Sequence, residues 1–241
     1  MSVQTKLPKV RTTAFTVMSQ MALEHDAVNL GQGFPDFPVP EALVDGLSKA
    51  MRDGRNQYAP MMGIPALREA IAEKTETCYG YKACPDSEIT VTSGASEAIF
   101  DAVLAAVRPG DEVIVLDPCY DCYEPAIDLA GGVCVHVPLH PQDFSVDWAR
   151  LSAAVTPKTR MIFINSPHNP SGALWKPEDM RRLIELVRGT GILVLSDEVY
   201  EHLFYDDHKS FPRLANVPGM WDRTVSIYSG GKIFSSTGVR V

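Results

Sequence analysis

Five short segments of the 241-residue chain carry side chains suited to chemistry, and each lies at or just after the end of a predicted strand. These segments are residues 93–96, 117–120, 165–172, 197–200 and 229–232. Lys232 offers an amine, which becomes a useful base or nucleophile when its pKa is depressed. Asp197 offers a carboxylate, and Tyr200 follows it by three residues. If a helical turn begins after the strand, this spacing places the carboxylate and the phenol on one side.

A second pattern favours the binding of an anion. Gly94, Ala95 and Ser96 open a predicted helix directly after a predicted strand. The unpaired N–H groups and the dipole of a helix N-terminus attract negative charge. The sequence therefore predicts an amine, a carboxylate and an anion site, all placed by loops after strands.

The elements that must position these residues alternate between strand-like and helix-like periods. The predicted strands are residues 89–92, 112–117, 132–138, 159–165, 192–197 and a strand from 224. The predicted helices are residues 63–80, 94–107, 120–130, 148–155 and 177–188. This alternation predicts an α/β fold with a mostly parallel sheet and helices on both faces. Such sheets bind ligands outside the carboxyl ends of their strands, so the five segments should converge on one site.

Composition and charge argue against several other classes of protein. The formal net charge is -8 and the basic residues are scattered, so we expect no nucleic-acid or membrane partner. The N-terminus does not resemble a secretory signal and no apolar run approaches a membrane span, which predicts a cytoplasmic protein. Five cysteines, an odd number, do not suggest a disulfide framework. Cys119 and Cys122 form a lone C-x-x-C motif, and we expect no metal site there.

The succession YAPMMG, TSGASEA, DPCYDCY, NSPHNPSG, SDEVYEH and SGGKIFSSTGVR resembles the class I aminotransferases of fold type I, which depend on pyridoxal 5'-phosphate (PLP). The resemblance is closest to the methionine and kynurenine aminotransferase branch, and it runs from about Lys6 to the last residue. It implies the large domain of the PLP-dependent transferase fold. Residues 1–40 would be an N-terminal arm with a substrate loop, and residues 41–241 the PLP-binding domain, incomplete at its C-terminal end.

The resemblance also implies the residues that would act on the cofactor. Lys232 matches the lysine that binds PLP covalently as a Schiff base and later moves a proton. Asp197 matches the carboxylate that pairs with the pyridine nitrogen, and Tyr200 and Asn169 match the residues that hydrogen-bond the phenolic oxygen. His168, beside Asn169, is either a catalytic or a structural histidine, and the family gives proton transfer to the lysine.

Further matches concern the phosphate, the ring face and the substrate. The phosphate ligands implied are Gly94, Ala95, Ser96, Ser229 and Arg240. Tyr120 resembles the aromatic residue that stacks on the cofactor ring, and Tyr58 resembles the residue that reaches the phosphate in a partner subunit, which implies a homodimer with shared active sites. Gly33 and Phe34 resemble the N-terminal substrate loop, and Asn169 also contacts substrate in this interpretation.

The activity implied is transfer of an amino group from a methionine, aromatic or kynurenine-like amino acid to a 2-oxo acid. Cysteine-conjugate β-lyases share the cofactor contacts, and these motifs do not separate the two activities. The sequence departs from the family at the Gly230-Gly231 pair, at Ile233 and at Val239. The family continues beyond the position of Val241 into a small domain that carries a substrate-binding arginine. A chain without it is also compatible with a non-catalytic protein that binds PLP or only pairs with another subunit.

Overall fold

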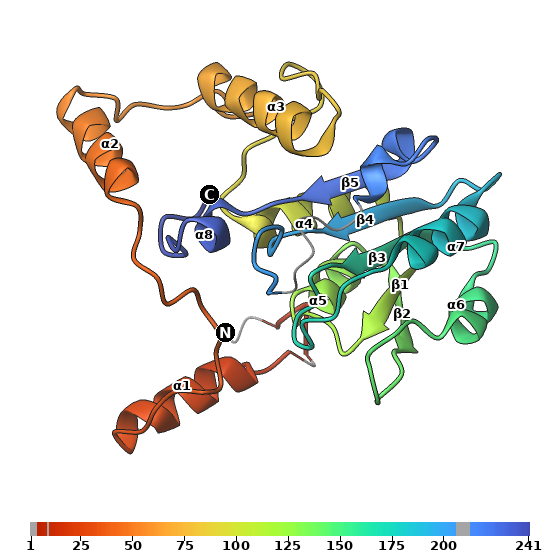
Figure 1. Cartoon of the computed structure of the whole chain (residues 1–241). Helices are drawn as coiled ribbons and strands as arrows, with labels where there is room; N and C mark the ends of the chain where they lie inside the picture. The colour runs from red at the N-terminus through yellow and green to blue at the C-terminus, as the bar shows by residue number, and fades with distance from the viewer. Residues whose placement is uncertain (1–3, 9, 206–212) are drawn as a thin grey trace.

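A five-stranded parallel sheet forms the centre of the computed structural model, which describes residues 4–8, 10–205 and 213–241 (Figure 1). The strand order is β2-β1-β3-β4-β5, and every neighbouring pair is parallel. The strands are β1 (Glu112–Asp117), β2 (Val133–Pro138), β3 (Thr159–Asn165), β4 (Leu193–Asp197) and β5 (Thr224–Ile227). Their carboxyl ends therefore meet along one edge of the sheet, as the sequence predicts.

Helices precede β1 and follow β1, β2, β3 and β5. They are α3 (Pro65–Tyr79), α4 (Ala95–Ala106), α5 (Tyr123–Leu129), α6 (Trp148–Ala154), α7 (Pro177–Val187) and α8 (Gly230–Ile233). Two short 3-10 helices, η1 (Leu214–Asn216) and η2 (Trp221–Arg223), precede β5. Within the described ranges, no helix combines the length and apolar character needed to cross a bilayer.

Helices cover both faces of the sheet. Side chains that alternate along the strands are therefore buried on one face or the other. On one face Ile114 and Ile162 pack with Leu151 of α6 and Leu183 of α7. On the other face the core contains strand residues and residues of α4 and α5, namely Val113, Val115, Met161, Phe163, Leu195, Ile99, Val103 and Ile127. This arrangement confirms the predicted α/β class with helices on both faces.

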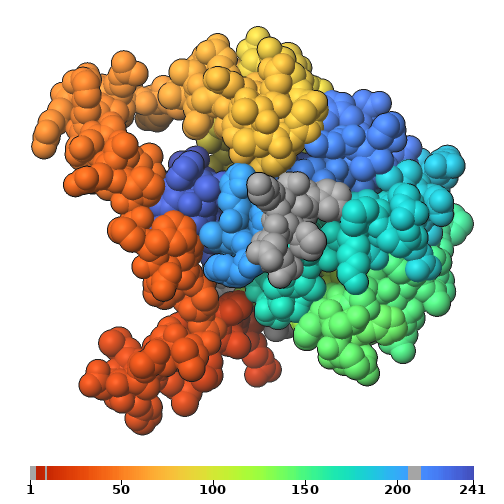
Figure 2. Space-filling model, viewed as in Figure 1, coloured from red at the N-terminus to blue at the C-terminus, as the bar shows by residue number. Residues whose placement is uncertain are grey.

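Two N-terminal helices project from this body (Figure 2). They are α1 (Ala14–Glu24) and α2 (Glu41–Arg52), and neither contains a buried residue. Exposed apolar side chains lie along both of them, including Val17, Met18, Met21, Leu43, Val44, Leu47 and Met51. The predicted division into an arm of residues 1–40 and a domain of residues 41–241 stays a prediction.

The strand predicted at residues 89–92 is wrong, because this segment joins no sheet in the described structure. Ile89 is buried against Ala72 and Ala83, so its apolar character serves packing against α3. The Val91 N–H donates to the Met62 carbonyl at 3.1 Å instead of to a strand. The helix predicted from residue 120 begins only at Tyr123, which leaves Tyr120 in the preceding loop.

The core of the α6/α7 face yields a test of stability. Leu183→Ala removes a fully buried side chain, so we expect the free energy of unfolding to fall by roughly 2–5 kcal/mol. Urea denaturation measures this change. Glu185→Ala, at an exposed position of the same helix, is the matched control and should stay within about 0.5 kcal/mol of the parent. Equal effects of the two substitutions would contradict the assigned packing of α7.

Candidate active site

The carboxylate of Asp197 lies buried at the carboxyl end of β4, with 3% of the residue exposed. The Tyr123 hydroxyl donates to Asp197 Oδ2 at 2.5 Å, and the Val199 N–H donates to Oδ1 at 3.2 Å. Burial raises the pKa of Asp197, while these two hydrogen bonds oppose the rise. In the part of the chain that the structure describes, Asp197 forms no ion pair. The site therefore contains a fixed carboxylate that a cationic group would stabilise.

Lys232 lies in the short helix α8, which follows β5, the strand next to β4. Its Nζ is 5.3 Å from the centroid of the Tyr200 ring. Burial and the nearby positive charge of Arg240 lower the pKa of Lys232. The neutral amine needed for nucleophilic or base chemistry is therefore easier to form than in an exposed lysine.

Arg240 lies against the first turn of α4, where Gly94 is the N-cap with a φ of 82°. A Cβ on residue 94 would overlap the Arg240 guanidinium, so glycine allows this close approach. The Arg240 guanidinium donates to the Thr237 carbonyl at 3.1 Å and to the Ser93 carbonyl at 3.5 Å. A cation and the free N–H groups of a helix start thus face the same space, as an anion site requires.

The glycine pair beside Lys232 is firmly held. The Gly231 N–H donates to the Val241 carbonyl at 3.0 Å, and the Ser236 N–H donates to the Gly231 carbonyl at 2.8 Å. A Cβ on Gly231 would lie 3.2 Å from the Thr237 Cα, so a larger residue would press on the loop that leads to Arg240. These contacts restrain the loop at a pair that the sequence alone would leave flexible.

One pocket of 740 Å³ collects most of the predicted site residues. Its lining contains Gly33, Phe34, Ala95, Ser96, Tyr120, Asn169, Asp197, Tyr200, Ser229, Lys232 and Arg240. Gly94 lies beside this lining, next to Ala95 and under Arg240. Tyr58 is fully exposed and does not line the pocket, so the structure does not bring it to the other residues. The Ser235 hydroxyl donates to the Pro35 carbonyl at 3.2 Å and ties the N-terminal loop to the segment after Lys232.

Several residues that position or line this pocket were not predicted from the sequence. Asn165 donates to the Asp197 carbonyl at 2.9 Å, and its side-chain oxygen accepts from the Asn169 N–H at 2.7 Å. Tyr123 holds the Asp197 carboxylate. Helix α1 adds Thr16 to the lining, and its start could have been found from Thr13, whose hydroxyl accepts from the Thr16 N–H as an N-cap. No local pattern marks Tyr123 or Asn165 in this way.

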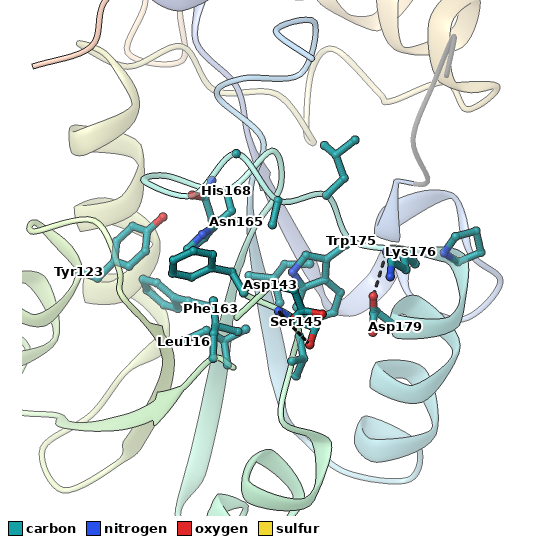
Figure 3. A pocket seen from close by; sticks show the side chains of 18 residues that line it. Leu116, Tyr123, Asp143, Ser145, Phe163, Asn165, His168, Trp175, Lys176 and Asp179 are labelled. Atoms are coloured by element: carbon teal, nitrogen blue, oxygen red, sulfur yellow. Dashed lines mark hydrogen bonds between the residues drawn. The ribbon is translucent and has the colours of Figure 1, made fainter. Parts of the chain in front are cut away.

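His168 makes hydrogen-bonding contacts within its own loop and with the loop after β1, and it does not line the pocket that contains Lys232. Its Nδ1 is 2.6 Å from the Ser171 hydroxyl and its Nε2 is 2.9 Å from the Pro118 carbonyl. Burial lowers the pKa of His168, which favours the neutral ring. It lines a second pocket of 510 Å³, together with Trp175 and with Asn165, which lines both pockets (Figure 3). With both ring nitrogens engaged, His168 has a structural role.

Comparison with known proteins places the chain in a family. The sequence model for class I and II aminotransferases matches residues 25–241, so the chain belongs to this family. The family and the similar structures imply PLP as the cofactor. Both the predicted family and the predicted fold type are confirmed.

Two curated relatives and one solved structure illustrate the similarity. The chain is 48% identical over 238 residues to the methionine aminotransferase of Escherichia coli (strain K12), a match that covers 99% of this chain and 61% of the relative. It is 41% identical over 231 residues to kynurenine–oxoglutarate transaminase 3 of Rattus norvegicus, covering 91% of this chain and 51% of that protein. A solved methionine aminotransferase structure from Escherichia coli has a TM-score of 0.95 at 46% identity, covering 100% of this chain and 63% of that one. The chain therefore spans only 51–61% of the length of these two curated relatives.

The charge of Arg240 gives a prediction about Lys232. A positive neighbour disfavours the ammonium form, so Arg240→Gln should raise the pKa of Lys232. The pH dependence of Lys232 labelling by an amine-reactive reagent, followed by peptide mass spectrometry, measures the shift. The labelling curve should move to higher pH in this variant and stay in place in Arg52→Gln, a control on the projecting helix α2. An unchanged labelling curve in Arg240→Gln would contradict an effect of Arg240 on the pKa of Lys232.

Proposed function

We propose that the chain provides the PLP-binding part of an aminotransferase, which transfers an amino group from an amino acid to a 2-oxo acid. One observation carries the proposal: Lys232, with its lowered pKa, and the buried Asp197 line the same pocket. Family membership and the similarity to named aminotransferases support it.

The residues of the pocket fit the cofactor. Asp197 is buried without an ion pair among the described residues, and a protonated pyridine nitrogen would supply the positive charge that stabilises it. Arg240 beside Gly94, with Ala95, Ser96 and Ser229, would hold the phosphate. Tyr120, which lies in the lining, would pack on the ring face.

Each of these residues then has a task in the reaction. PLP, when bound, supplies an electron sink that stabilises negative charge at the substrate Cα. Lys232 Nζ would hold the cofactor until the substrate amine replaces it, and would then take the proton from the substrate Cα. Tyr200 and Asn169 would donate hydrogen bonds to the phenolic oxygen of the cofactor. Asp197 would keep the ring nitrogen protonated, and Tyr123 and Asn165 position that aspartate.

The amino donor we propose is methionine, an aromatic amino acid or a kynurenine-like amino acid. Gly33 and Phe34 of the N-terminal loop line the pocket, and Phe15 of α1 adds a second aromatic side chain. An apolar donor side chain would find favourable contacts there. The names of the relatives from Escherichia coli and Rattus norvegicus support the same substrate classes.

We further propose that the protein acts as a cytoplasmic homodimer with shared active sites. The exposed apolar side chains along α1 and α2 offer a surface that another subunit would cover. Tyr58 follows α2, and its full exposure leaves it available to reach the phosphate bound by a partner subunit. The five free cysteines agree with a reducing compartment.

Loading with PLP tests the cofactor assignment. We expect purified protein incubated with PLP to gain the visible absorbance of covalently bound cofactor, and borohydride reduction to fix the cofactor to the peptide that contains Lys232. Lys232→Ala should lose both signals, whereas Lys158→Ala, at an exposed position, should keep them. A fixed cofactor on another lysine would refute the assignment. Conversion of methionine to its 2-oxo acid tests transfer itself, and loading without turnover would favour the non-catalytic alternative.

The role of Tyr58 gives a separate prediction. Tyr58→Phe should weaken PLP binding by roughly 10-fold or less, because one hydrogen bond to a charged group contributes about 1.5–3 kcal/mol when buried and less when solvent competes. Tyr205→Phe is the control, since Tyr205 is similarly exposed at 97%. Titration with PLP should be combined with analytical ultracentrifugation. A monomer at all concentrations, or equal PLP affinity in both variants, would contradict the shared site.

A further inference from the structure

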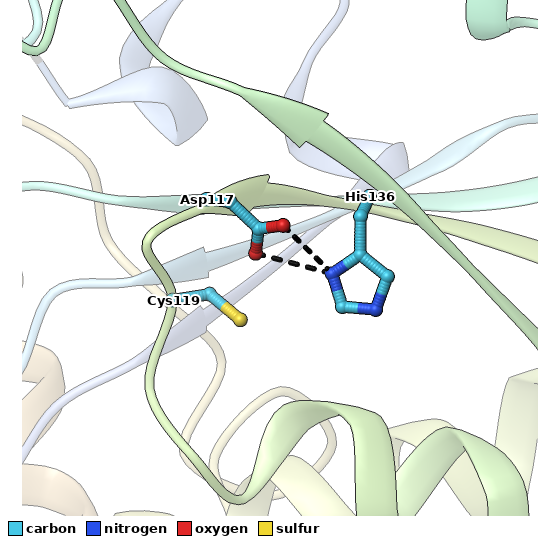
Figure 4. Close-up of side chains that lie close together, drawn as sticks. All are labelled: Asp117, Cys119 and His136. Atoms are coloured by element: carbon cyan, nitrogen blue, oxygen red, sulfur yellow. Dashed lines mark hydrogen bonds and ion pairs between the residues drawn. The ribbon is translucent and has the colours of Figure 1, made fainter. Parts of the chain in front are cut away.

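A cluster of three different ligand types lies at the ends of β1 and β2, in a position that the proposed reaction does not use (Figure 4). Asp117 ends β1, His136 lies on the edge strand β2, and Cys119 follows two residues after Asp117. One ligand atom from each of these residues lies within 4.8 Å of the others. Figure 4 shows the Cys119 sulfur and the carboxylate and ring of the other two side chains turned toward the same space.

The register of the sheet explains the cluster. Val115 pairs with His136 and Asp117 pairs with Pro138, so His136 lies two residues before the partner of Asp117. Side chains two residues apart on a strand point to the same face, and Val115, Asp117 and His136 therefore share one face. The loop after β1 then returns Cys119 to this face. Cys122, the other cysteine of the C-x-x-C motif, lies near Ser96 and Asp197 instead.

The two nitrogens of His136 face different partners. Nδ1 lies 2.9 Å and 3.1 Å from the two oxygens of Asp117, and Nε2 lies 3.8 Å from Glu124 Oε2. The ion pairs that Asp117 and Glu124 make within the described ranges are both with His136. A histidine that ligates a metal through one nitrogen commonly directs its other N–H to a carboxylate. Glu124 is positioned to act as this orienting carboxylate.

We propose that Asp117, Cys119 and His136 Nδ1 bind one divalent cation of the zinc class, with Glu124 orienting His136 and a water completing the tetrahedron. A carboxylate, a thiolate and a neutral imidazole would balance the two positive charges of the ion. A tetrahedral zinc ion holds such ligands about 3.3–3.5 Å apart, so Cys119 would move inward and Asp117 would separate slightly from His136. Because β2 is an edge strand and His136 and Asp117 are 39% and 34% exposed, the ion can enter from solvent.

Binding would release the thiol proton of Cys119 to solvent as the metal–sulfur bond forms. The neutral imidazole of His136 would carry its one proton on Nε2, facing Glu124, so that the Nδ1 lone pair is free to bind the metal. Because a bound cation replaces the thiol proton, the affinity for the cation should increase with pH.

Cobalt(II) is the direct probe, because a cobalt–thiolate bond adds a charge-transfer absorption band. We expect chelator-treated protein, in buffer without phosphate or added PLP, to bind one Co²⁺ per chain with such a band, and Zn²⁺ to displace it. Cys119→Ser should abolish the band. His136→Asn should weaken binding by roughly 10-fold or more, and Glu124→Gln by roughly 10-fold, as expected for an orienting partner.

Cys122→Ser and Cys78→Ser are the matched controls and should keep the band. Loss of the band in Cys122→Ser but not in Cys119→Ser would overturn the proposal in favour of the C-x-x-C motif. Absence of the band in the parent protein, or unchanged affinity in His136→Asn, would also overturn it. Thermal unfolding with and without Zn²⁺ checks that each variant folds, and only proteins with the intact cluster should gain melting temperature from the ion.

Discussion

The burial of the Asp197 carboxylate is the constraint on which the rest of the site depends. A carboxylate removed from water requires hydrogen bonds or a cation, and Asp197 has the Tyr123 hydroxyl and the Val199 N–H. Asn165 holds the backbone carbonyl of the same residue and the loop that carries Asn169. Three elements, α5, β3 and the turn after β4, are thereby fixed around one charge. The carboxylate is therefore held in place before any ligand arrives.

The segment after β4 is fixed from its rear as well. Glu198 and Glu201 alternate with Asp197 and Tyr200, and both are almost fully buried. The Arg213 guanidinium pairs with Glu198 and lies 3.8 Å from Glu201, which also pairs with Lys74. A buried ion pair is weak evidence of stability, because the cost of desolvation offsets the attraction. Removing one partner is nevertheless destabilising, because it leaves the other charge buried without compensation. The main effect of this ion-pair cluster is therefore to fix the position of the turn after β4, and stabilisation of the whole chain is the smaller effect.

Local patterns predicted most of the fold, because buried parallel strands and capped helices have strong signatures. The helix predicted over residues 63–80 forms as α3, from Pro65 to Tyr79 with Gly80 as its C-cap, and the apolar runs of β1 and β3 lie in the sheet. The segment from Ile89 has the same composition as a strand, but composition does not supply a neighbour with which to pair. The lining of the pocket could be predicted since parallel strands end at one edge. Tyr123 and Asn165 could not, because their roles arise from hydrogen bonds between residues 32 and 74 positions apart.

The hydrogen bond between Ser235 and Pro35 joins parts of the chain that are 200 residues apart. The pocket is lined by residues from Thr13, the N-cap of α1, to Arg240, so segments from both ends and the middle of the chain contribute to one small volume. Contacts of such wide separation in sequence form late in folding, after loop-closure entropy has been overcome. During synthesis the strands near the middle of the chain can pair before the pocket exists. Ligand affinity thus depends on contacts between distant segments, and its appearance reports that these late contacts have formed.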